Sequence, residues 1–207
     1  MRILGVDPGL TRCGISVLDA HGARRVELVD VSVARTEPTM APHQRLLIIF
    51  NAIEKAISQF DPDVVAFERV FAHENLRSVT GTAQVAGIVM LAAARAGLPI
   101  GMHSPSEVKA AVTGNGQAHK SQVQLMVQRI LRLEKPPRPK DAADAIAVAI
   151  CHAWRGGAEY IVDKSRAQYG GADMLPRAEG ADLTPAQQAW ALAERDSRRA
   201  GAVARKE

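Results

Sequence analysis

The stretch that decides the fold is Ile3-Leu4-Gly5-Val6-Asp7-Pro8-Gly9, an apolar run that ends on a carboxylate and then turns. Its β-branched residues and lack of helical spacing predict a strand buried on both faces, and Pro8-Gly9 is turn chemistry that ends the strand. Asp7 is therefore expected at a sheet edge. For an isolated Asp-Pro-Gly the alternative is an Asp that only caps the turn, so other carboxylates must decide between the two.

The same arrangement recurs at Val64-Val65-Ala66-Phe67-Glu68, an apolar strand whose last residue is again a carboxylate. A helix with apolar residues at three- and four-residue steps, residues 46–60, leads to this strand. Strands joined by a helical crossover are expected to be parallel, so Asp7 and Glu68 would emerge at one edge. Ligands bind at that edge in open α/β sheets. The alternative for Glu68 is a lone exposed acid at a strand end.

Three more strands complete the predicted sheet. The first two alternate in polarity and are expected to form an antiparallel meander with the opening strand, while the third is short. Further helices are expected at 75–97, from Ser104, at 123–133 and from Asp141. The predicted strands are Cys13–Asp19, Arg25–Val33 and Leu98–His103. The chain is therefore of the α/β class with a mixed five-stranded sheet.

Length and composition favour one well-buried domain. The chain has 207 residues, 47% of them apolar and 23% charged, and a formal charge of +4 that tolerates a polyanionic partner. Residues 1–157 are predicted to form this domain. Residues 158–207 are polar and predicted to be a disordered tail, in which Thr184 can start one isolated helix.

The sequence also indicates a compartment. The start lacks a signal peptide pattern, and no run approaches the roughly 18 apolar residues of a membrane span. Cys13 and Cys151 are predicted to be small buried hydrophobes in a reducing environment, without the spacing of a zinc site. We therefore expect a cytoplasmic protein with no membrane partner.

Two further carboxylates, Asp141 and Asp144, share one face in the first turn of the last predicted helix. Helix capping explains either one alone, but it explains two less well, because the alanines around Asp144 indicate close packing. Four acids at one place would repel one another unless cations neutralise them. Mg²⁺ accepts such hard oxygen ligands, and two ions about 4 Å apart can activate water for phosphodiester hydrolysis.

Basic and aromatic residues are predicted to surround these acids. The loop 113–121 is polar, basic and glycine-containing, so with Lys109 and Lys120 it can hold a phosphate backbone; a solvated surface loop is the alternative. Phe71 lies in a loop after Glu68, where it can stack on a base or simply pack against the next helix. The predicted basic rim consists of Arg69, Arg77, Lys109 and Lys120.

These motifs, in this order, resemble the RuvC family of Holliday-junction resolvases, in the ribonuclease H-like superfamily. The similarity covers residues 1 to about 157, and the tail falls outside it. The segments that carry it are Ile3 to Gly9, Phe67-Glu68-Arg69-Val70-Phe71, Lys120-Ser121-Gln122-Val123-Gln124 and residues 141–149. It implies a three-layer fold with helices on both faces of the sheet.

The resemblance implies the site and the reaction. It places the catalytic, metal-binding acids at Asp7, Glu68, Asp141 and Asp144, a junction-facing aromatic at Phe71 and DNA-binding lysines at Lys109 and Lys120. Some members have His where Asp141 stands. The implied reaction is Mg²⁺-dependent paired nicking that leaves 5′-phosphate and 3′-hydroxyl ends, with two ions for which Mn²⁺ can substitute.

The implied partners are four-way junction DNA, a second copy of the chain packed through the long helix 75–97, and the RuvA and RuvB branch-migration proteins. Without the resemblance, that helix is equally well explained by deep burial. Three other functions remain open: an actin-like ATPase, since Asp7-Pro8-Gly9 also resembles a phosphate-binding turn; a YqgF-like nuclease; and a junction-binding module that does not cut.

Overall fold

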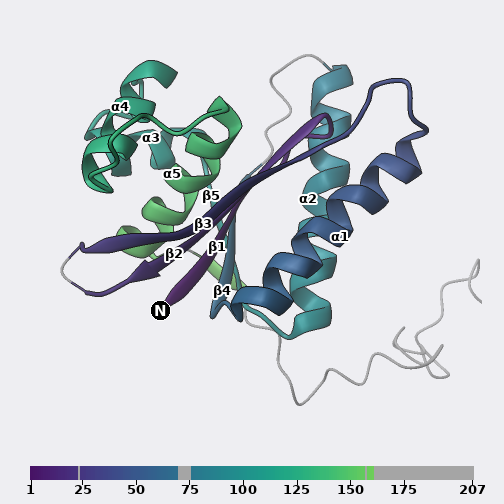
Figure 1. The fold of residues 1–207 in the computed structure, drawn as a ribbon, viewed down its shortest axis with the longest axis horizontal. Helices are drawn as coiled ribbons and strands as arrows, with labels where there is room; N and C mark the ends of the chain where they lie inside the picture. The colour runs from purple at the N-terminus through teal and green to yellow at the C-terminus, as the bar shows by residue number, and fades with distance from the viewer. Residues whose placement is uncertain (23, 70–75, 157, 161–207) are drawn as a thin grey trace, which may run out of the picture. The chain divides into compact units, whose positions relative to one another are not determined.

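The structure is a computed structural model that describes residues 1–22, 24–69, 76–156 and 158–160, with the backbone alone at 76–78 and 158–160. All of these residues lie in one compact unit, Met1–Ala167. Figure 1 shows the elements, which are, in chain order, β1 (Arg2–Asp7), β2 (Arg12–Ala20), β3 (Val26–Arg35), α1 (Pro42–Phe60), β4 (Val64–Glu68), α2 (Leu76–Ala96), β5 (Ile100–His103), α3 (Pro105–Thr113), α4 (Lys120–Ile130), α5 (Lys140–Arg155) and β6 (Ala158–Tyr160).

The strands form one mixed sheet in the order β3-β2-β1-β4-β5-β6. The meander β1-β2-β3 is antiparallel, whereas β4 and β5 run parallel to β1. All five predicted strands are therefore confirmed. The sheet also has a sixth strand, β6, antiparallel to β5 and beyond the predicted domain end at residue 157. With only three residues, β6 shows no alternation that a sequence pattern could have revealed.

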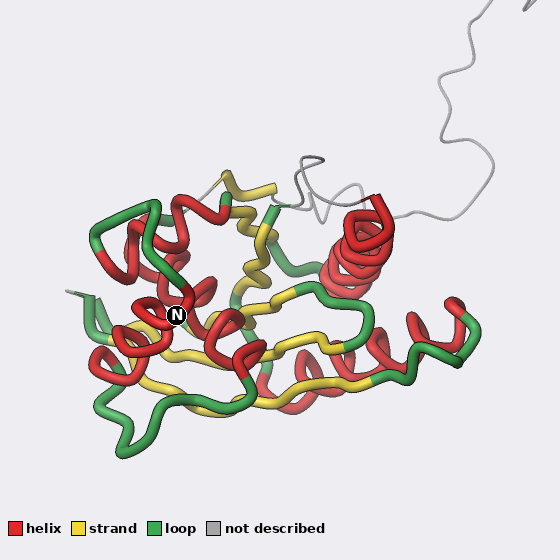
Figure 2. Tube along the Cα trace, turned by 90° about the horizontal axis from the view of Figure 1, so that it is seen from above, coloured by secondary structure: helices red, strands yellow, loops and turns green. Residues whose placement is uncertain are grey.

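The sheet lies between two helical layers, as Figure 2 shows from above. Side chains of a strand alternate between its faces, and the buried residues of β1 divide accordingly. Leu4 and Val6 belong to the core formed with α1 and α2, whereas Ile3 packs in the core formed with α3, α4 and α5. Residues at odd positions of β1, Asp7 included, therefore face the α5 side.

Helix α2 confirms the predicted long helix and packs one side against the sheet. Val85, Val89 and Ala93 are fully buried in the first core. Among the described residues, Val79–Ala96 is the one segment long and apolar enough to cross a membrane by length and composition, and a third of it is buried. The core helices of proteins that do not span a membrane can meet the same criterion. The exposed residues of α2 include Met90 and Leu91.

Helix α4 corrects one boundary. The sequence placed Lys120 in a loop and predicted a helix at 123–133, but α4 runs Lys120–Ile130. The backbone N–H of His119 donates to Gln122 Oε1 at 2.9 Å, which starts the helix earlier. At the other end, the chain leaves helical geometry through Arg132, whose φ is 52°. The predicted start at Ser104 is confirmed, with a capping box to Glu107.

Both cysteines are buried and free, as predicted. Cys13 packs in the core on the α1 side of the sheet, and Cys151 packs in the core on the α5 side.

Phe71 and the tail residues 161–207, with the helix predicted from Thr184, lie outside the described residues. The domain boundaries at 157 and 158 stay a prediction.

Candidate active site

Asp7 and Glu68 end neighbouring parallel strands and point to one face of the sheet. The register pairs Ile3 with Val64 and continues to Val6 with Phe67, so the next residue of each strand is one of these acids. Val64 and Ala66 pack in the core on the α5 side, and Glu68 shares their face by alternation. Both carboxylates therefore emerge at the C-terminal edge of the sheet, below α5.

Two glycines let α5 approach this edge closely. A Cβ at Gly5 would meet the carbonyl oxygen of Ala145 and the methyl group of Ala149, and a Cβ at Gly14 would meet the Asp141 carbonyl oxygen. Any larger residue would have to push the helix away from β1 and β2. Gly14 is also the cross-strand partner of Asp7. The first turn of α5 is therefore held directly over the end of β1.

Asp141 lies in that first turn, as the sequence predicted, whereas Asp144 follows in the next turn, because α5 begins at Lys140, one residue before Asp141. Each is half-buried and pairs with a cation from another element: Arg12 Nε lies 3.3 Å from Asp141 Oδ2, and Lys120 Nζ lies 3.2 Å from Asp144 Oδ2. Arg12 begins β2 and Lys120 begins α4. The structure thus gathers carboxylates from two strand ends and one helix start, together with two cations.

The pKa of the Asp7 carboxyl also reflects the nearby acids. Burial, and then the negative charges of Asp144, Glu68 and Asp141, raise the pKa of the Asp7 carboxyl to about 7, against an opposing effect of Lys120. Asp144 in turn raises the pKa of the Lys120 ammonium above its ordinary value. The other three acids therefore act on Asp7, whose carboxyl lies in a poorly solvated position where like charges repel strongly.

The donor set fits a divalent cation. Carboxylate oxygens are the ligands that Mg²⁺ and similar hard cations prefer, and a cation would relieve the repulsion on Asp7. In the described part of the chain, however, no three His, Cys, Asp or Glu side chains are grouped tightly enough to enclose an ion as they stand. In this structure the carboxylates of Asp141 and Asp144 are paired with Arg12 and Lys120 instead.

The predicted basic residues lie on different elements of the fold, and they differ in their contacts with the acids. Lys120 contacts the acids through Asp144. Arg69 follows Glu68 directly and is exposed, while its backbone N–H donates to the His103 carbonyl oxygen at 2.7 Å. Lys109 lies half-buried on α3, and within the described residues no ion pair joins it to the four acids. For Arg77 the structure describes the backbone only, in the first turn of α2.

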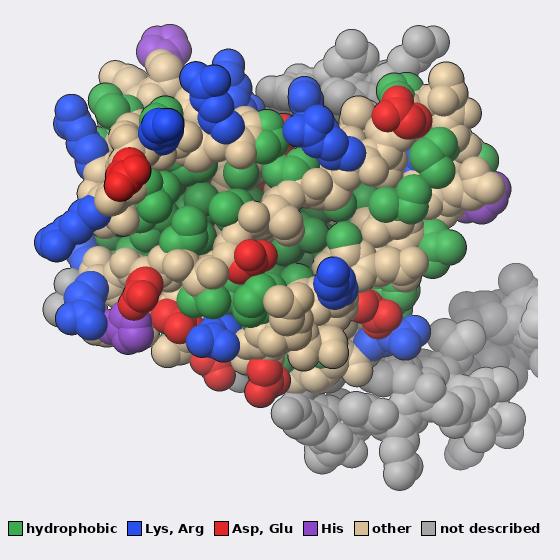
Figure 3. Space-filling view, viewed as in Figure 1, with side chains coloured by type: hydrophobic (Ala, Val, Ile, Leu, Met, Phe, Trp, Pro, Cys, Tyr) green, Lys and Arg blue, Asp and Glu red, His purple; other side chains and the backbone are tan. Residues whose placement is uncertain are grey.

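A cleft of about 560 Å³ opens beside the acids. Its walls come from the start of β2, from α4, from the proline-rich segment before α5 and from the first turn of α5. The residues that line it are Arg12, Lys120, Gln124, Pro136, Arg138, Pro139, Lys140, Asp141 and Asp144. Figure 3 shows Lys and Arg side chains along the upper edge of the face seen in Figure 1. Because Arg12, Lys120, Arg138 and Lys140 line it, the cleft is suited to an anionic substrate.

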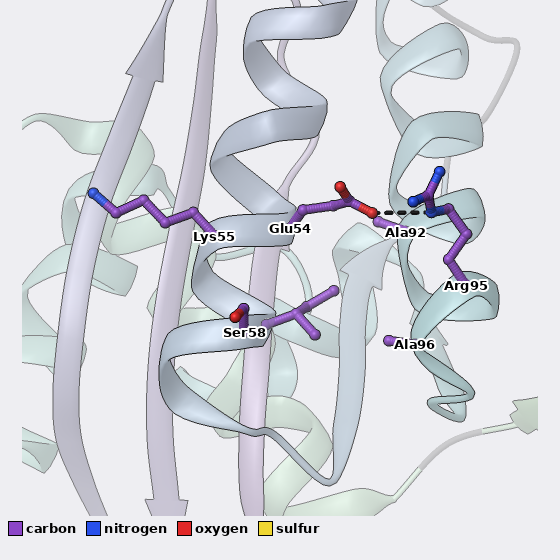
Figure 4. A pocket seen from close by; sticks show the side chains of 7 residues that line it. Glu54, Lys55, Ser58, Ala92, Arg95 and Ala96 are labelled. Atoms are coloured by element: carbon purple, nitrogen blue, oxygen red, sulfur yellow. Dashed lines mark ion pairs between the residues drawn. The ribbon is translucent and has the colours of Figure 1, made fainter.

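A second groove, of about 460 Å³, lies between α1 and α2 on the opposite face of the sheet. Glu54 on α1 and Arg95 on α2 pair across it at 3.0 Å, as Figure 4 shows. None of the four acids lines this groove. It is therefore not a candidate for the chemistry of the site.

Sequence reasoning missed Arg12 and the histidine pair beside Glu68. Arg12 lies two residues before Gly14 on β2, hence on the α5 face, a position that follows only from the register of Gly14 with Asp7 in the structure. His103 is the β5 neighbour of Glu68, and its Nε2 lies 3.1 Å from Nδ1 of His152 on α5. Nothing in the spacing of the two histidines indicates this contact.

Comparisons with known proteins point in one direction. The protein-family model for crossover junction endodeoxyribonuclease RuvC matches residues 3–152. The crossover junction endodeoxyribonuclease RuvC of Leifsonia xyli subsp. xyli is 50% identical over 100% of this chain and 98% of its own length. That of a Nocardioides species is 56% identical over 79% of this chain and 92% of its own.

A solved structure agrees with these relatives. The structure of Thermus thermophilus RuvC in complex with a Holliday junction substrate superposes with a TM-score of 0.70 at 35% identity, covering 74% of this chain and 93% of that one. The fold similarity therefore extends over about three quarters of this chain and nearly all of the Thermus chain.

Proposed function

The chain belongs to the RuvC family of crossover junction endodeoxyribonucleases, and on that premise we propose that it resolves four-way DNA junctions with Asp7, Glu68, Asp141 and Asp144 as its catalytic acids. The ribonuclease H-like fold expected from the sequence is confirmed by the match to the Thermus protein. The observation that carries the proposal is the geometry: the register of β1 and β4 puts Asp7 and Glu68 at one edge of the sheet, and the close approach of α5 brings Asp141 and Asp144 to the same edge.

The residues of the site would have different roles in the reaction. Asp7, Glu68, Asp141 and Asp144 would hold divalent cations, which when bound supply an activated water and neutralise charge at the cut phosphate. Lys120 lies beside Asp144 and can hold a neighbouring phosphate oxygen. The half-buried position of the acids limits the water around the reacting group. Hydrolysis would leave 5′-phosphate and 3′-hydroxyl ends.

The family implies a divalent metal, and we propose Mg²⁺, with two ions in each site and Mn²⁺ able to substitute. Four carboxylates supply enough negative charge for two ions. Arg12 and Lys120 would have to release Asp141 and Asp144 when ions bind. Because both ion pairs are partly exposed, the release should have only a small effect on the stability of the fold.

A homodimer through α2 is part of the proposal. Met90 and Leu91 are 41% and 50% exposed on this helix, although its other side is buried in the core. Large apolar side chains exposed next to each other favour an interface. A two-fold dimer would present one site to each of two opposed strands of a four-way junction, which itself has approximate two-fold symmetry. Paired nicks follow from that geometry.

The remaining proposals rest on the family. We expect the chain to act in the cytoplasm, after the RuvA and RuvB branch-migration proteins have moved the junction. Phe71, which lies outside the described residues, is expected to stack on a base at the junction. Lys109 and Arg69 are expected to contact DNA at greater distance from the acids than Lys120, and Arg77 to contact it from α2.

The test is cleavage of a synthetic immobile four-way junction by the purified protein in Mg²⁺, with cuts mapped on all four strands. Symmetric cuts on two opposed strands, absent with Asp7→Asn and absent on linear duplex, would support the proposal. Binding without nicking would favour the non-cleaving module. Preferential cutting of RNA would favour the YqgF-like alternative, and ATP hydrolysis without cutting the actin-like one.

A further inference from the structure

One wall of the cleft beside the acids is the proline-rich segment that precedes α5. Pro136, Arg138, Pro139 and Lys140 all line the cleft, and Asp141 follows directly in the chain. Any strand that lies over the acids and extends into this cleft would therefore pass along this wall. None of the basic residues expected from the sequence lies on it.

The wall is held in place by α4. Gln124 Nε2 donates to the Pro137 carbonyl oxygen at 2.8 Å, and Pro137 itself is buried. Proline also restricts the backbone dihedral φ on either side of Arg138. The backbone of the segment is therefore fixed while the side chains of Arg138 and Lys140 stay exposed. A fixed backbone lowers the entropy cost of binding through these side chains.

The charges of the cleft are unevenly paired. Arg12 and Lys120 are paired with Asp141 and Asp144, whereas within the described residues Arg138 and Lys140 form no ion pair. The acids that line the cleft would attract cations, and the Arg138 and Lys140 side chains would attract an anion. A chain of phosphates that lies across metal-bound acids matches both kinds of charge.

We propose that Arg138 and Lys140 form a phosphate-binding wall that holds the cut strand next to the scissile phosphate. This inference rests on the proposed function, because it needs a DNA strand at the acids. Arg138 can bind a phosphate through two N–H groups, and Lys140 can bind one as a point charge. Gln124 is a positioning residue for this wall, since its side-chain amide donates to the Pro137 carbonyl oxygen of the segment.

The first test is the salt dependence of junction binding in metal-free buffer, where no strand is cut. The variant Arg138→Ala/Lys140→Ala should bind more weakly than the wild type. The slope of log K against log salt should fall by roughly 0.7 to 0.9 for each phosphate that the variant no longer binds. The control is Arg25→Ala, because Arg25 is exposed and precedes β3, at the end of β2 opposite Arg12. It should leave the slope unchanged.

The second test places the contact on the DNA. A neutral methylphosphonate replaces single phosphates on either side of the cut site, one junction at a time. For the wild type, one or two positions next to the cut should weaken binding about tenfold. With Arg138→Ala/Lys140→Ala the same positions should have no further effect, because the side chains that bind these phosphates are absent. An equal decrease in affinity in both proteins at every position would overturn the inference.

The experiments distinguish an error in the phosphate-binding wall from an error in the proposed function. If the wild type cuts the junction symmetrically but the double variant keeps the wild-type salt slope, the phosphate-binding wall is wrong and the nuclease assignment stands. If the wild type neither binds nor cuts the junction, the proposed function itself is wrong. Gln124→Ala should reproduce part of the decrease in affinity with a normal thermal melt, and full wild-type affinity would remove Gln124 from the positioning role.

Discussion

Gly14 lies directly beneath Asp141: a Cβ on Gly14 would fall against the Asp141 carbonyl oxygen and close to the Ala145 methyl group. The same glycine is the cross-strand partner of Asp7. The missing side chain at Gly14 therefore allows the start of α5 to lie close to β2, next to the end of β1. The position of the acids depends on this packing as much as on the acids themselves.

Gly14→Ala should therefore damage both the fold and the chemistry. A methyl group at this position meets backbone, which cannot rotate away, so we expect a loss of about 1–3 kcal/mol in unfolding free energy. Because α5 must move outward, metal binding and cleavage should fall further than the lower stability explains. Chemical denaturation and cleavage kinetics, measured on protein that is still folded, check the two effects separately.

The control is Ser58→Ala on α1, because Ser58 is exposed and lies outside both the acids and the proposed interface on α2. Alanine favours helix over serine, so this variant should be as stable as the wild type or more stable. If Gly14→Ala proved as harmless as Ser58→Ala, the close approach of α5 to β2 would be wrong.

Asp7→Asn should separate metal binding from DNA binding. The amide removes one charge from four acids that repel one another, so the metal-free protein should be slightly more stable at pH 8, whereas the added stability that Mg²⁺ confers should disappear. For the wild type that increment is about 2.7 kcal/mol at one hundred times the dissociation constant. Melting curves with Mg²⁺ and with EDTA measure it, and junction affinity at low salt should be retained.

The control is Asp61→Asn at the end of α1. Asp61 has a φ of 46°, a left-handed geometry that asparagine tolerates, so neither stability nor the response to Mg²⁺ should change. Retained nicking by Asp7→Asn would remove Asp7 from the catalytic set.

The sequence could predict the strands and the convergence of the acids because each depends on local patterns. An apolar run ending on Asp7, a second ending on Glu68 and a helical crossover between them are enough to place two carboxylates at one edge. The pairing of Arg12 with Asp141 and of His103 with His152 could not be predicted, since it depends on the register of the strands and on how closely α5 packs against the sheet. The spacing of residues along the chain does not indicate that packing distance.

The buried pair of His103 and His152 predicts an acid-sensitive fold. Burial, and then the charge of His152, lower the pKa of His103 to about 4, with Glu107 opposing and Arg69 and Arg155 adding to the shift. The unfolded chain takes up a proton near pH 6.5, whereas folded His103 stays neutral until about pH 4. The unfolding free energy therefore keeps its full value above pH 6.5, and it decreases by up to about 3 kcal/mol as the pH falls toward 4.

Urea unfolding at several pH values between 4 and 8 measures this decrease in stability. In His103→Asn the part of the decrease due to His103 should vanish, although the variant can be less stable at pH 7. A variant curve parallel to the wild type at every pH would show that His103 is not the group responsible.

Lys120→Ala should weaken junction binding without destabilising the fold. The side chain of Lys120 is 74% exposed, so its ion pair with Asp144 contributes little, on the order of 0–1 kcal/mol. Because the variant would bind one phosphate fewer, the salt slope should fall by about 0.9 and cleavage should slow. Lys55→Ala, on the α1–α2 side of the sheet, serves as the control and should bind like the wild type. An unchanged slope for Lys120→Ala would identify Lys120 as a solvated surface residue.

Leu91→Glu should test the dimer through α2. Leu91 is 50% exposed in the described chain, so a charge there is tolerated by the monomer, but burying it in an interface between two copies would be unfavourable. We expect a dimer for the wild type and a monomer for the variant by light scattering, with unchanged helical content. The variant should also lose paired nicking, because only one site then reaches the junction. Leu125→Glu on α4, where Leu125 is 45% exposed, is the control that should remain dimeric. A dimeric Leu91→Glu would place the interface elsewhere.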